Sequence, residues 1–278
     1  MWGRFIGKGF RERLASKDLG EVKSNGSITG MQLGLDFVRK INGNGSATFA
    51  GAYSGYADGS SSDTNIFQDV ARRSGGSKSK GWLAGLYGTH YGATGWYANA
   101  AVQASFLDAA ANAANGTTLR TDARTLLGSL EMGKTLKLGG RMAFEPQFQV
   151  IYSNNKFDGA VDSAGTLNEV AIEDSMIARA GFRLKTTKDE KYNADGGLFS
   201  GYLKANLWHS FLGTDIALTS AGQAVGKFEP KKTWVDVGVG TTLTVAKQTE
   251  IFFDADVEFG IDQKTTAGTG KIGLRFNW

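Results

Sequence analysis

The stretch Val235–Val245 reads VDVGVGTTLTV and alternates between apolar side chains and small or polar ones. Successive side chains of a β-strand point to opposite faces of the sheet, so this stretch presents one apolar face and one polar face. The same period of two recurs in the second half of the chain, at Met142–Tyr152, Met176–Lys185, Ile251–Phe259 and Ile272–Trp278. The pattern predicts amphipathic strands.

The first half of the chain shows the same alternation more weakly, in Met31–Phe37 and Trp96–Gln103. Further strands are expected near residues 2–11, 46–57, 81–91 and 123–135. The total is about twelve strands, each long enough for the about 9 to 11 residues that a tilted membrane strand needs.

The composition agrees with a barrel. The chain has 39 glycines and only 2 prolines, which is typical of many strands joined by polar turns. There is no apolar run of about 18 residues or more, so no helix is expected to cross a bilayer. The mean hydropathy is −0.24, as expected when only alternate residues face lipid. We therefore expect an all-β fold, a transmembrane antiparallel up-and-down β-barrel.

The connections are expected to alternate in length, because outer-membrane barrels have short periplasmic turns and longer outer loops. Short turns rich in Gly and Asn are expected at 42–45, 92–95, 137–140, 188–197 and 246–249. Long polar loops are expected near 12–26, 58–79, 107–122, 154–172, 213–231 and 261–269. This parity places both termini in the periplasm. Pro146 cannot donate a ladder hydrogen bond, so we expect a bulge or an unpaired neighbour there.

Several kinds of chemistry find no support in the sequence. The chain has no cysteine, which removes disulfides, thiol catalysis and sulfur-based metal sites. Its net charge of +4 is spread without a block of like charges, so no nucleic-acid partner is expected. Neither His90 nor His209 lies in a motif that supplies a nucleophile and its base. We expect no catalytic residues, no metal and no cofactor.

The first residues, Met1–Phe5, do not begin a charged segment followed by an apolar segment and a cleavage site. An outer-membrane protein needs such a signal peptide to leave the cytoplasm. We therefore expect the chain to be a mature fragment or the C-terminal part of a longer precursor.

The C-terminal residues KIGLRFNW resemble the assembly signal of bacterial outer-membrane barrels. That signal has a polar residue, a glycine and two aromatic residues at fixed positions before the chain end. Lys271, Gly273, Phe276 and Trp278 fill these positions. The resemblance implies a barrel that the outer-membrane assembly machinery inserts.

Other motifs resemble one family, the translocators of autotransporters. Gly30–Asp36 reads GMQLGLD and Gly51–Tyr56 reads GAYSGY, similar to the family's G-x-Q-x-G-x-D and G-x-x-x-G-Y motifs. Further similarities are Trp2-Gly3-Arg4 at the start, Glu145-Pro146-Gln147 in the middle, and Tyr202–Phe211 with its His-x-Phe end. The resemblance covers essentially the whole chain and points to the pertactin-like branch, which includes the BrkA type.

The resemblance implies a single twelve-stranded domain over residues 1–278 in the bacterial outer membrane. The barrel would export its own N-terminal passenger by type V secretion, as a monomer. The family also carries a lumenal helix upstream of the first strand, where this sequence has not yet begun. The expected partners are outer-membrane lipid, the passenger segment in the lumen and the barrel assembly machinery. Two alternatives stay open, a passive diffusion porin and an outer-membrane hydrolase.

Charged residues on the polar faces are candidates for lining a wet lumen that accommodates an extended passenger. They are Glu145, Arg179, Arg183, Lys185, Lys204, Asp236, Asp254, Asp256, Glu258 and Arg275. The same charges would also be explained if they only pair and stabilise the barrel. Trp2, Phe276 and Trp278 are candidates for an aromatic girdle at the periplasmic interface.

Overall fold

The computed structural model describes residues 1–16, 20–67, 70–172, 174–186, 198–213, 216–228, 230–246 and 248–276. Within these ranges twelve antiparallel strands close into a barrel, which confirms the expected fold class. The strands are β1 (Trp2–Ser16), β2 (Gly20–Ile41), β3 (Ala47–Phe67), β4 (Val70–Tyr91), β5 (Trp96–Ala113), β6 (Thr118–Lys134), β8 (Met142–Phe157), β11 (Ser175–Thr186), β12 (Leu198–Leu212), β15 (Thr233–Ala246), β16 (Thr249–Gly260) and β17 (Thr266–Phe276). No helix in this part of the chain is long and apolar enough to cross a membrane.

The barrel closes between its first and last strands. β1 pairs with β17 from Trp2 opposite Arg275 to Arg11 opposite Thr266. At the chain ends, Phe276 N donates to Met1 O at 2.8 Å. A closed sheet lets every backbone N–H and C=O pair within the protein, which removes the cost of unsatisfied groups in hydrocarbon.

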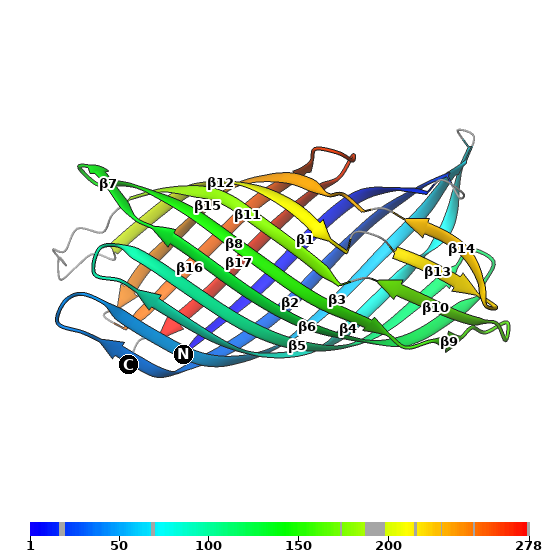
Figure 1. Ribbon diagram of the computed structural model, residues 1–278, viewed down its shortest axis with the longest axis horizontal. Helices are drawn as coiled ribbons and strands as arrows, with labels where there is room; N and C mark the ends of the chain where they lie inside the picture. The colour runs from blue at the N-terminus through cyan, green and yellow to red at the C-terminus, as the bar shows by residue number, and fades with distance from the viewer. Residues whose placement is uncertain are drawn as a thin grey trace.

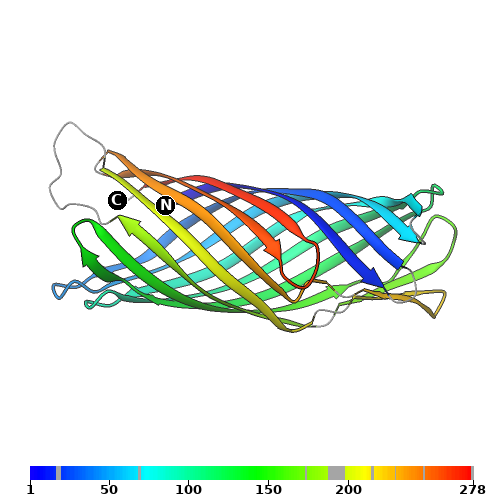
Figure 2. The same cartoon turned by 90° about the horizontal axis from the view of Figure 1, so that it is seen from above.

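The two ends of the barrel differ (Figures 1 and 2). One end carries both chain termini and the connections β2–β3 and β4–β5, whose turns are short. In these turns Gly45 and Gly95 both have φ of +84°, a left-handed conformation that glycine adopts without strain. We name this the short-turn end and the opposite one the hairpin end. The short turn predicted at 188–197 lies outside the described residues.

The prediction of long loops is wrong for the first hairpins. β2 and β4 each have 22 residues, about twice the 9 to 11 that span a membrane. Segments 12–26 and 58–79 are largely paired strand, up to Ser16 opposite Gly20 and Phe67 opposite Val70. A strand that leaves the membrane has water on both faces, so it loses the apolar alternation by which it was recognised.

The longer predicted loops 154–172 and 213–231 contain a second sheet at the hairpin end (Figure 1). It consists of β9 (Ala160–Val161), β10 (Leu167–Ile172), β13 (Ile216–Ser220) and β14 (Gln223–Phe228), in the order β14-β13-β10-β9. The β9–β10 turn repeats the glycine geometry, with Gly165 at φ +84°.

Pro146 interrupts the pairing on one side of β8, while on the other side it stays in register opposite Phe182 of β11. β6 pairs with β8 as far as Gly133, and pairing resumes at Leu136 in the short strand β7 (Leu136–Gly139). The unpaired step lies opposite Pro146, which has no N–H to donate. The predicted unpaired neighbour is therefore confirmed.

Candidate functional site: the inner face of the barrel

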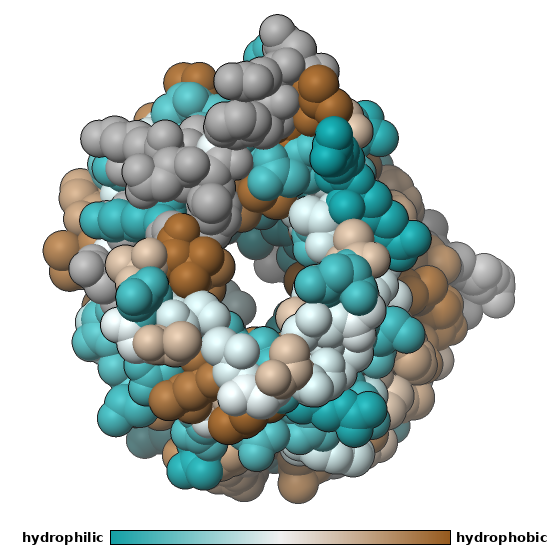
Figure 3. Space-filling model, turned by 90° about the vertical axis from the view of Figure 1, so that its right-hand side faces the viewer, coloured by the Kyte–Doolittle hydropathy of each residue, from teal (hydrophilic) through white to brown (hydrophobic). Residues whose placement is uncertain are grey.

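The outer surface of the barrel is apolar and its inner face is polar. Phe5, Trp82 and Phe106 point outward and are 62%, 65% and 60% exposed. Most buried side chains are polar and include Gln32, Glu145, Gln147, Arg179, Asn206, Asp236 and Asp254. Figure 3 looks at the hairpin end and shows an opening at its centre. This arrangement suits a barrel with lipid outside and water inside.

Glu145 is the centre of one inner cluster. Thr135 Oγ1 donates to Glu145 Oε2 at 2.6 Å, and Gln147 Nε2 donates to Glu145 Oε1 at 3.0 Å. Lys185 forms an ion pair with Glu145, and Arg183 Nη1 lies 3.9 Å from its Oε1. Both carboxylate oxygens of the Glu-Pro-Gln motif therefore have partners, and the two cations come from the neighbouring strand β11.

Glu131 of β6 extends this cluster. Tyr97 Oη donates to Glu131 Oε1 at 2.6 Å, and Gln147 Nε2 donates to Tyr97 Oη at 2.8 Å. Arg179 Nη2 lies 2.8 Å from Glu131 Oε2, and the guanidinium carbon lies 5.3 Å from the centre of the Trp208 ring. The buried Arg179 charge is thus balanced by a carboxylate and by an aromatic face.

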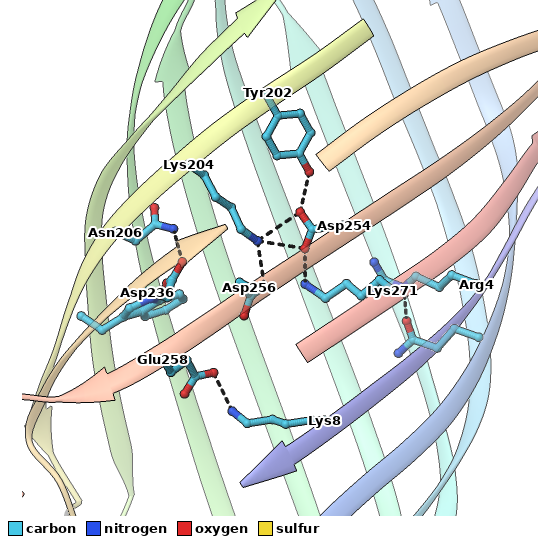
Figure 4. Close-up of polar contacts among 12 residues, drawn as sticks. Arg4, Lys8, Tyr202, Lys204, Asn206, Asp236, Asp254, Asp256, Glu258 and Lys271 are labelled. Carbon is cyan, nitrogen blue, oxygen red and sulfur yellow. Dashed lines mark hydrogen bonds and ion pairs between the residues drawn. The ribbon is translucent and has the colours of Figure 1, made fainter. Parts of the chain in front are cut away.

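Asp254 is the centre of a second cluster (Figure 4). Lys204 Nζ lies 2.8 Å from Asp254 Oδ1 and 2.8 Å from Asp256 Oδ1. Tyr202 Oη donates to Asp254 Oδ2 at 2.5 Å, and Lys271 Nζ lies 3.5 Å from Oδ1. The arrangement places one cation between two carboxylates of β16.

Arg183 connects the two clusters. Its guanidinium carbon lies 5.1 Å from the centre of the Tyr202 ring, while the same side chain faces Glu145. A continuous polar network therefore runs across β5, β6, β8, β11, β12, β16 and β17.

The remaining candidates lie beside this network. Asn206 Nδ2 donates to Asp236 Oδ1 at 2.8 Å. Glu258 is held between Lys8 at 2.7 Å and Lys231 at 3.1 Å. Figure 4 shows the Lys8 contact, which joins β16 to β1 across the closure. Arg275 pairs with Glu250 at 3.4 Å and is more exposed than the others.

Aromatic rings pack together on the inner face of β1, β3 and β4 near the short-turn end. Trp2 Nε1 donates to Tyr87 Oη at 2.9 Å, and Tyr87 donates to Asp36. Tyr53 lies with its ring centre 6.0 Å from that of Trp2. The expectation that Trp2 belongs to the outer girdle is therefore wrong. Phe5 is outward, so the alternation of β1 directs Trp2 inward.

Several of these inner rings rest on a glycine directly opposite them on the next strand. Tyr97 is opposite Gly133 and Tyr202 is opposite Gly240. A Cβ atom added at Gly133 would lie 2.5 Å from the Tyr97 ring, and one at Gly240 would lie 2.2 Å from the Tyr202 ring. Because any larger residue would displace the ring, these glycines fix where the aromatic side chains lie.

The structure gives each of the ten predicted lumen candidates a polar or charged partner. Their role in lining an export path stays a prediction. Sequence reasoning missed three of their partners, Lys8, Glu131 and Lys231, and also Tyr97, which donates to Glu131. Glu131 alternates with Leu130 and Met132 and could have been found by extending the alternation through β6. The pairing of Lys8 with Glu258 depends on closure and has no signal in either strand alone.

The C-terminal motif residues have distinct places. Lys271 faces Asp254, and Gly273 lies beneath the Phe252 ring. Phe276 is exposed and is hydrogen-bonded through its backbone to Met1. Trp278 lies outside the described residues.

The two histidines are far apart in the sheet and have separate partners. His90 Nδ1 lies 2.8 Å from Thr48 Oγ1, and His209 Nδ1 lies 2.9 Å from Thr233 Oγ1. Within the ranges that the structure covers, no group of three or more acidic, histidine or cysteine side chains is placed to hold a metal ion.

The fold is similar to solved autotransporter barrels. The transport unit of AIDA-I from Escherichia coli aligns with a TM-score of 0.84 at 17% identity, over 100% of this chain and 90% of that chain. The beta domain of Bordetella BrkA aligns with a TM-score of 0.68 at 18% identity, over 99% of both chains. The translocator domain of NalP from Neisseria meningitidis gives 0.67 at 13% identity, over 100% of this chain and 89% of that chain.

A curated relative agrees with this likeness. The adhesin BmaC autotransporter of Brucella suis biovar 1 (strain 1330) is 25% identical over 237 residues, which is 82% of this chain. The chain spans only 7% of the length of that relative. The autotransporter beta-domain family matches residues 1–256. The chain therefore belongs to the autotransporter beta-domain family and is an outer-membrane translocator pore.

Proposed function

We propose that the barrel exports a passenger attached to its own N-terminus, with the passenger in contact with the inner face described above. The observation that carries this proposal is the connected polar network on the inner face, which spans both halves of the barrel. A hydrated lining with both charge signs can accommodate an extended polypeptide of varied sequence without trapping it, because no single strong site dominates. The network itself performs no covalent chemistry.

The proposed orientation places both termini in the periplasm and the hairpin end outside the cell. It is supported by the position of Met1 and of the C-terminal end of β17 at the short-turn end (Figure 1). Residues 1–278 then act as one barrel domain, with passenger and lumenal helix on the N-terminal side. Cysteine labelling tests the orientation. A cysteine at Asn44 should resist a membrane-impermeant maleimide in intact cells, and one at Ala114 should react; the reverse pattern would contradict it.

The role of the inner charges is tested with Asp254→Asn combined with Asp256→Asn, in a precursor carrying an epitope-tagged passenger. We expect less passenger at the cell surface at an unchanged barrel level, because Lys204 loses both carboxylates. The control is Glu12→Gln with Glu169→Gln, which removes two charges at the hairpin end. Unchanged display in the Asp254 and Asp256 variant would leave these charges only a stabilising role.

Assembly depends on the C-terminal motif in this proposal. Deleting Trp278 should reduce insertion by the barrel assembly machinery much more than it reduces the heat resistance of barrel already inserted. Equal effects on both measurements would contradict an assembly signal. The closed sheet presents no free edge to a second copy, so we also propose a monomer, which native mass spectrometry can test.

A further inference from the structure

The outward face of β3 to β5 changes from apolar to charged at one row of residues in register. Tyr56, Trp82 and Phe106 are opposite one another on neighbouring strands, and the Tyr56 and Trp82 rings meet edge to face at 5.1 Å. On β5 the outward belt from Trp96 to Phe106 matches the about 9 to 11 residues of a membrane span. Aromatic rows of this kind mark the membrane interface. The row therefore marks the boundary of the belt on the side of the hairpin end.

On β6 the residue opposite Phe106 is already charged, Arg124, and on β3 to β5 charged residues begin in the next outward row. Asp58, Lys80, Asp108 and Asp122 follow one another in register across β3 to β6. Asp158 N donates to Asp122 O at 2.9 Å and continues the row. Asp108 and Asp122 are directly opposed like charges, an arrangement that destabilises a strand pair.

Lys78 and Arg120 lie one outward row farther from the belt, and both are opposite Ala110. Together with the previous row they line a cavity of about 740 Å³. We name the seven charged lining residues the collar, which consists of Asp58, Lys78, Lys80, Asp108, Arg120, Asp122 and Asp158. None of these side chains has a side-chain hydrogen bond or ion pair within the described ranges.

We propose that the collar binds the phosphate groups of an outer-leaflet glycolipid headgroup, bridged to the aspartates by a divalent cation. Lys78, Lys80 and Arg120 supply cations that phosphate prefers. The opposed aspartates would repel phosphate unless a cation such as Mg²⁺ lies between them, with oxygen ligands from both sides. The described carboxylates do not form a metal cluster by themselves, so the phosphate oxygens complete the coordination.

The position of the collar explains why a lipid is the ligand. The cavity begins directly beyond the aromatic row, at the level of the headgroups, so acyl chains can lie along the Trp82 and Phe106 belt while phosphates reach the collar. That this leaflet is the outer one rests on the orientation proposed above. The binding measurement below needs no passenger, so its failure is distinguishable from a failure of export.

The test uses the barrel in detergent with bisphosphorylated lipid A and Mg²⁺, followed by native mass spectrometry. Lys78→Gln, Lys80→Gln and Arg120→Gln together should weaken lipid A binding roughly a hundredfold. Each cation near an anionic lipid surface raises the binding constant by roughly the same factor, so the three losses multiply. The control Arg72→Gln, Arg73→Gln and Lys137→Gln removes equal charge elsewhere and should bind as the parent does. Retained heat-modifiable migration in gels verifies folding of both variants.

The cation is tested separately. EDTA should release lipid A from the parent but have little further effect on Asp108→Asn with Asp122→Asn, which already binds weakly. Tighter binding by that variant, with no effect of EDTA, would overturn the cation bridge. Equal binding by the Lys78, Lys80 and Arg120 variant would overturn the site. Displacement by inorganic phosphate with Mg²⁺, or preference for phosphatidylethanolamine, would assign the collar to another ligand and overturn the glycolipid proposal.

Discussion

The inner network and the outer collar contain similar charged residues, but those of the inner network form ion pairs and those of the collar do not. On the inner face Glu145, Glu131 and Asp254 each face a cation within the same structure. On the collar, Asp108 lies in register between Lys80 and Asp122, and neither aspartate forms an ion pair within the described residues. The barrel therefore pairs the charged groups that it encloses, whereas the collar residues form no ion pair within the described residues and, in our proposal, bind an external ligand.

The largest expected effect is from breaking the inner network at its centre. Glu145→Ala leaves Lys185 and Arg183 facing each other without their carboxylate. Loss of one partner of a buried pair costs about 3 to 5 kcal/mol, which we reduce to about 2 to 3 because both cations are about one-third exposed. The midpoint of heat-induced unfolding on gels should fall clearly. The control Glu21→Ala, whose pair with Arg13 is exposed, should change it little.

A steric substitution tests whether the Tyr97 ring, which belongs to the inner network, is held in place by the glycine opposite it. Gly133→Ala should destabilise the barrel by about 1 to 3 kcal/mol, because the new methyl group collides with the Tyr97 ring. Gly128→Ala in the same strand is the matched control, since a Cβ there meets nothing within 4 Å. Similar heat resistance of the two variants would show that the Tyr97 ring moves freely.

A smaller effect of opposite sign is expected on the collar. Asp122→Asn removes the repulsion with Asp108 and should stabilise the lipid-free barrel by less than about 1 kcal/mol. The corresponding change on the inner face, Glu131→Gln, should destabilise it because Arg179 loses its carboxylate. Unfolding midpoints that move in the same direction would remove the contrast between the two regions.

The smallest effect concerns a charge outside both regions. The backbone N–H of Thr166, with further donors, holds the pKa of Asp162 below its usual value. The β9–β10 turn therefore gains stability from ionised Asp162 above about pH 4 and loses it as the pH falls through the lowered pKa. Carbon NMR titration of the Asp162 carboxyl should show this low value, and Thr166→Pro, which removes the donor, should raise it.

The sequence predicts which residues face inward and outward better than it predicts how long the strands are. Alternation in β15 or β16 identifies each face because lipid and water impose opposite demands on neighbouring residues. Where β2 and β4 leave the membrane that demand ends, and paired strand cannot be distinguished from loop. The girdle prediction for Trp2 was wrong for a different reason. An aromatic residue near a chain end suits either the membrane interface or the barrel interior, and only its alternation with the outward Phe5 shows that Trp2 points inward.

The partners of the site were less predictable than its members. Asp254, Asp256 and Lys204 each lie on a polar face that the pattern marks, but which cation meets which carboxylate depends on strand register and tilt. The collar could not be predicted from the sequence either, because it too depends on strand register. Asp58, Lys80 and Asp108 are separated by more than twenty residues along the chain, and only pairing brings them into one row.

The unusual length of β2 to β5 has a geometric consequence for export. Beyond the aromatic row, β4 continues from Trp82 back to Val70, still paired with β3. At about 3.3 Å per residue, and allowing for tilt, this wall rises roughly 20 to 30 Å above the headgroups. In the proposed orientation, an exported polypeptide would stay beside this wall while it crosses the surface glycolipid layer, and it would begin to fold only beyond that layer.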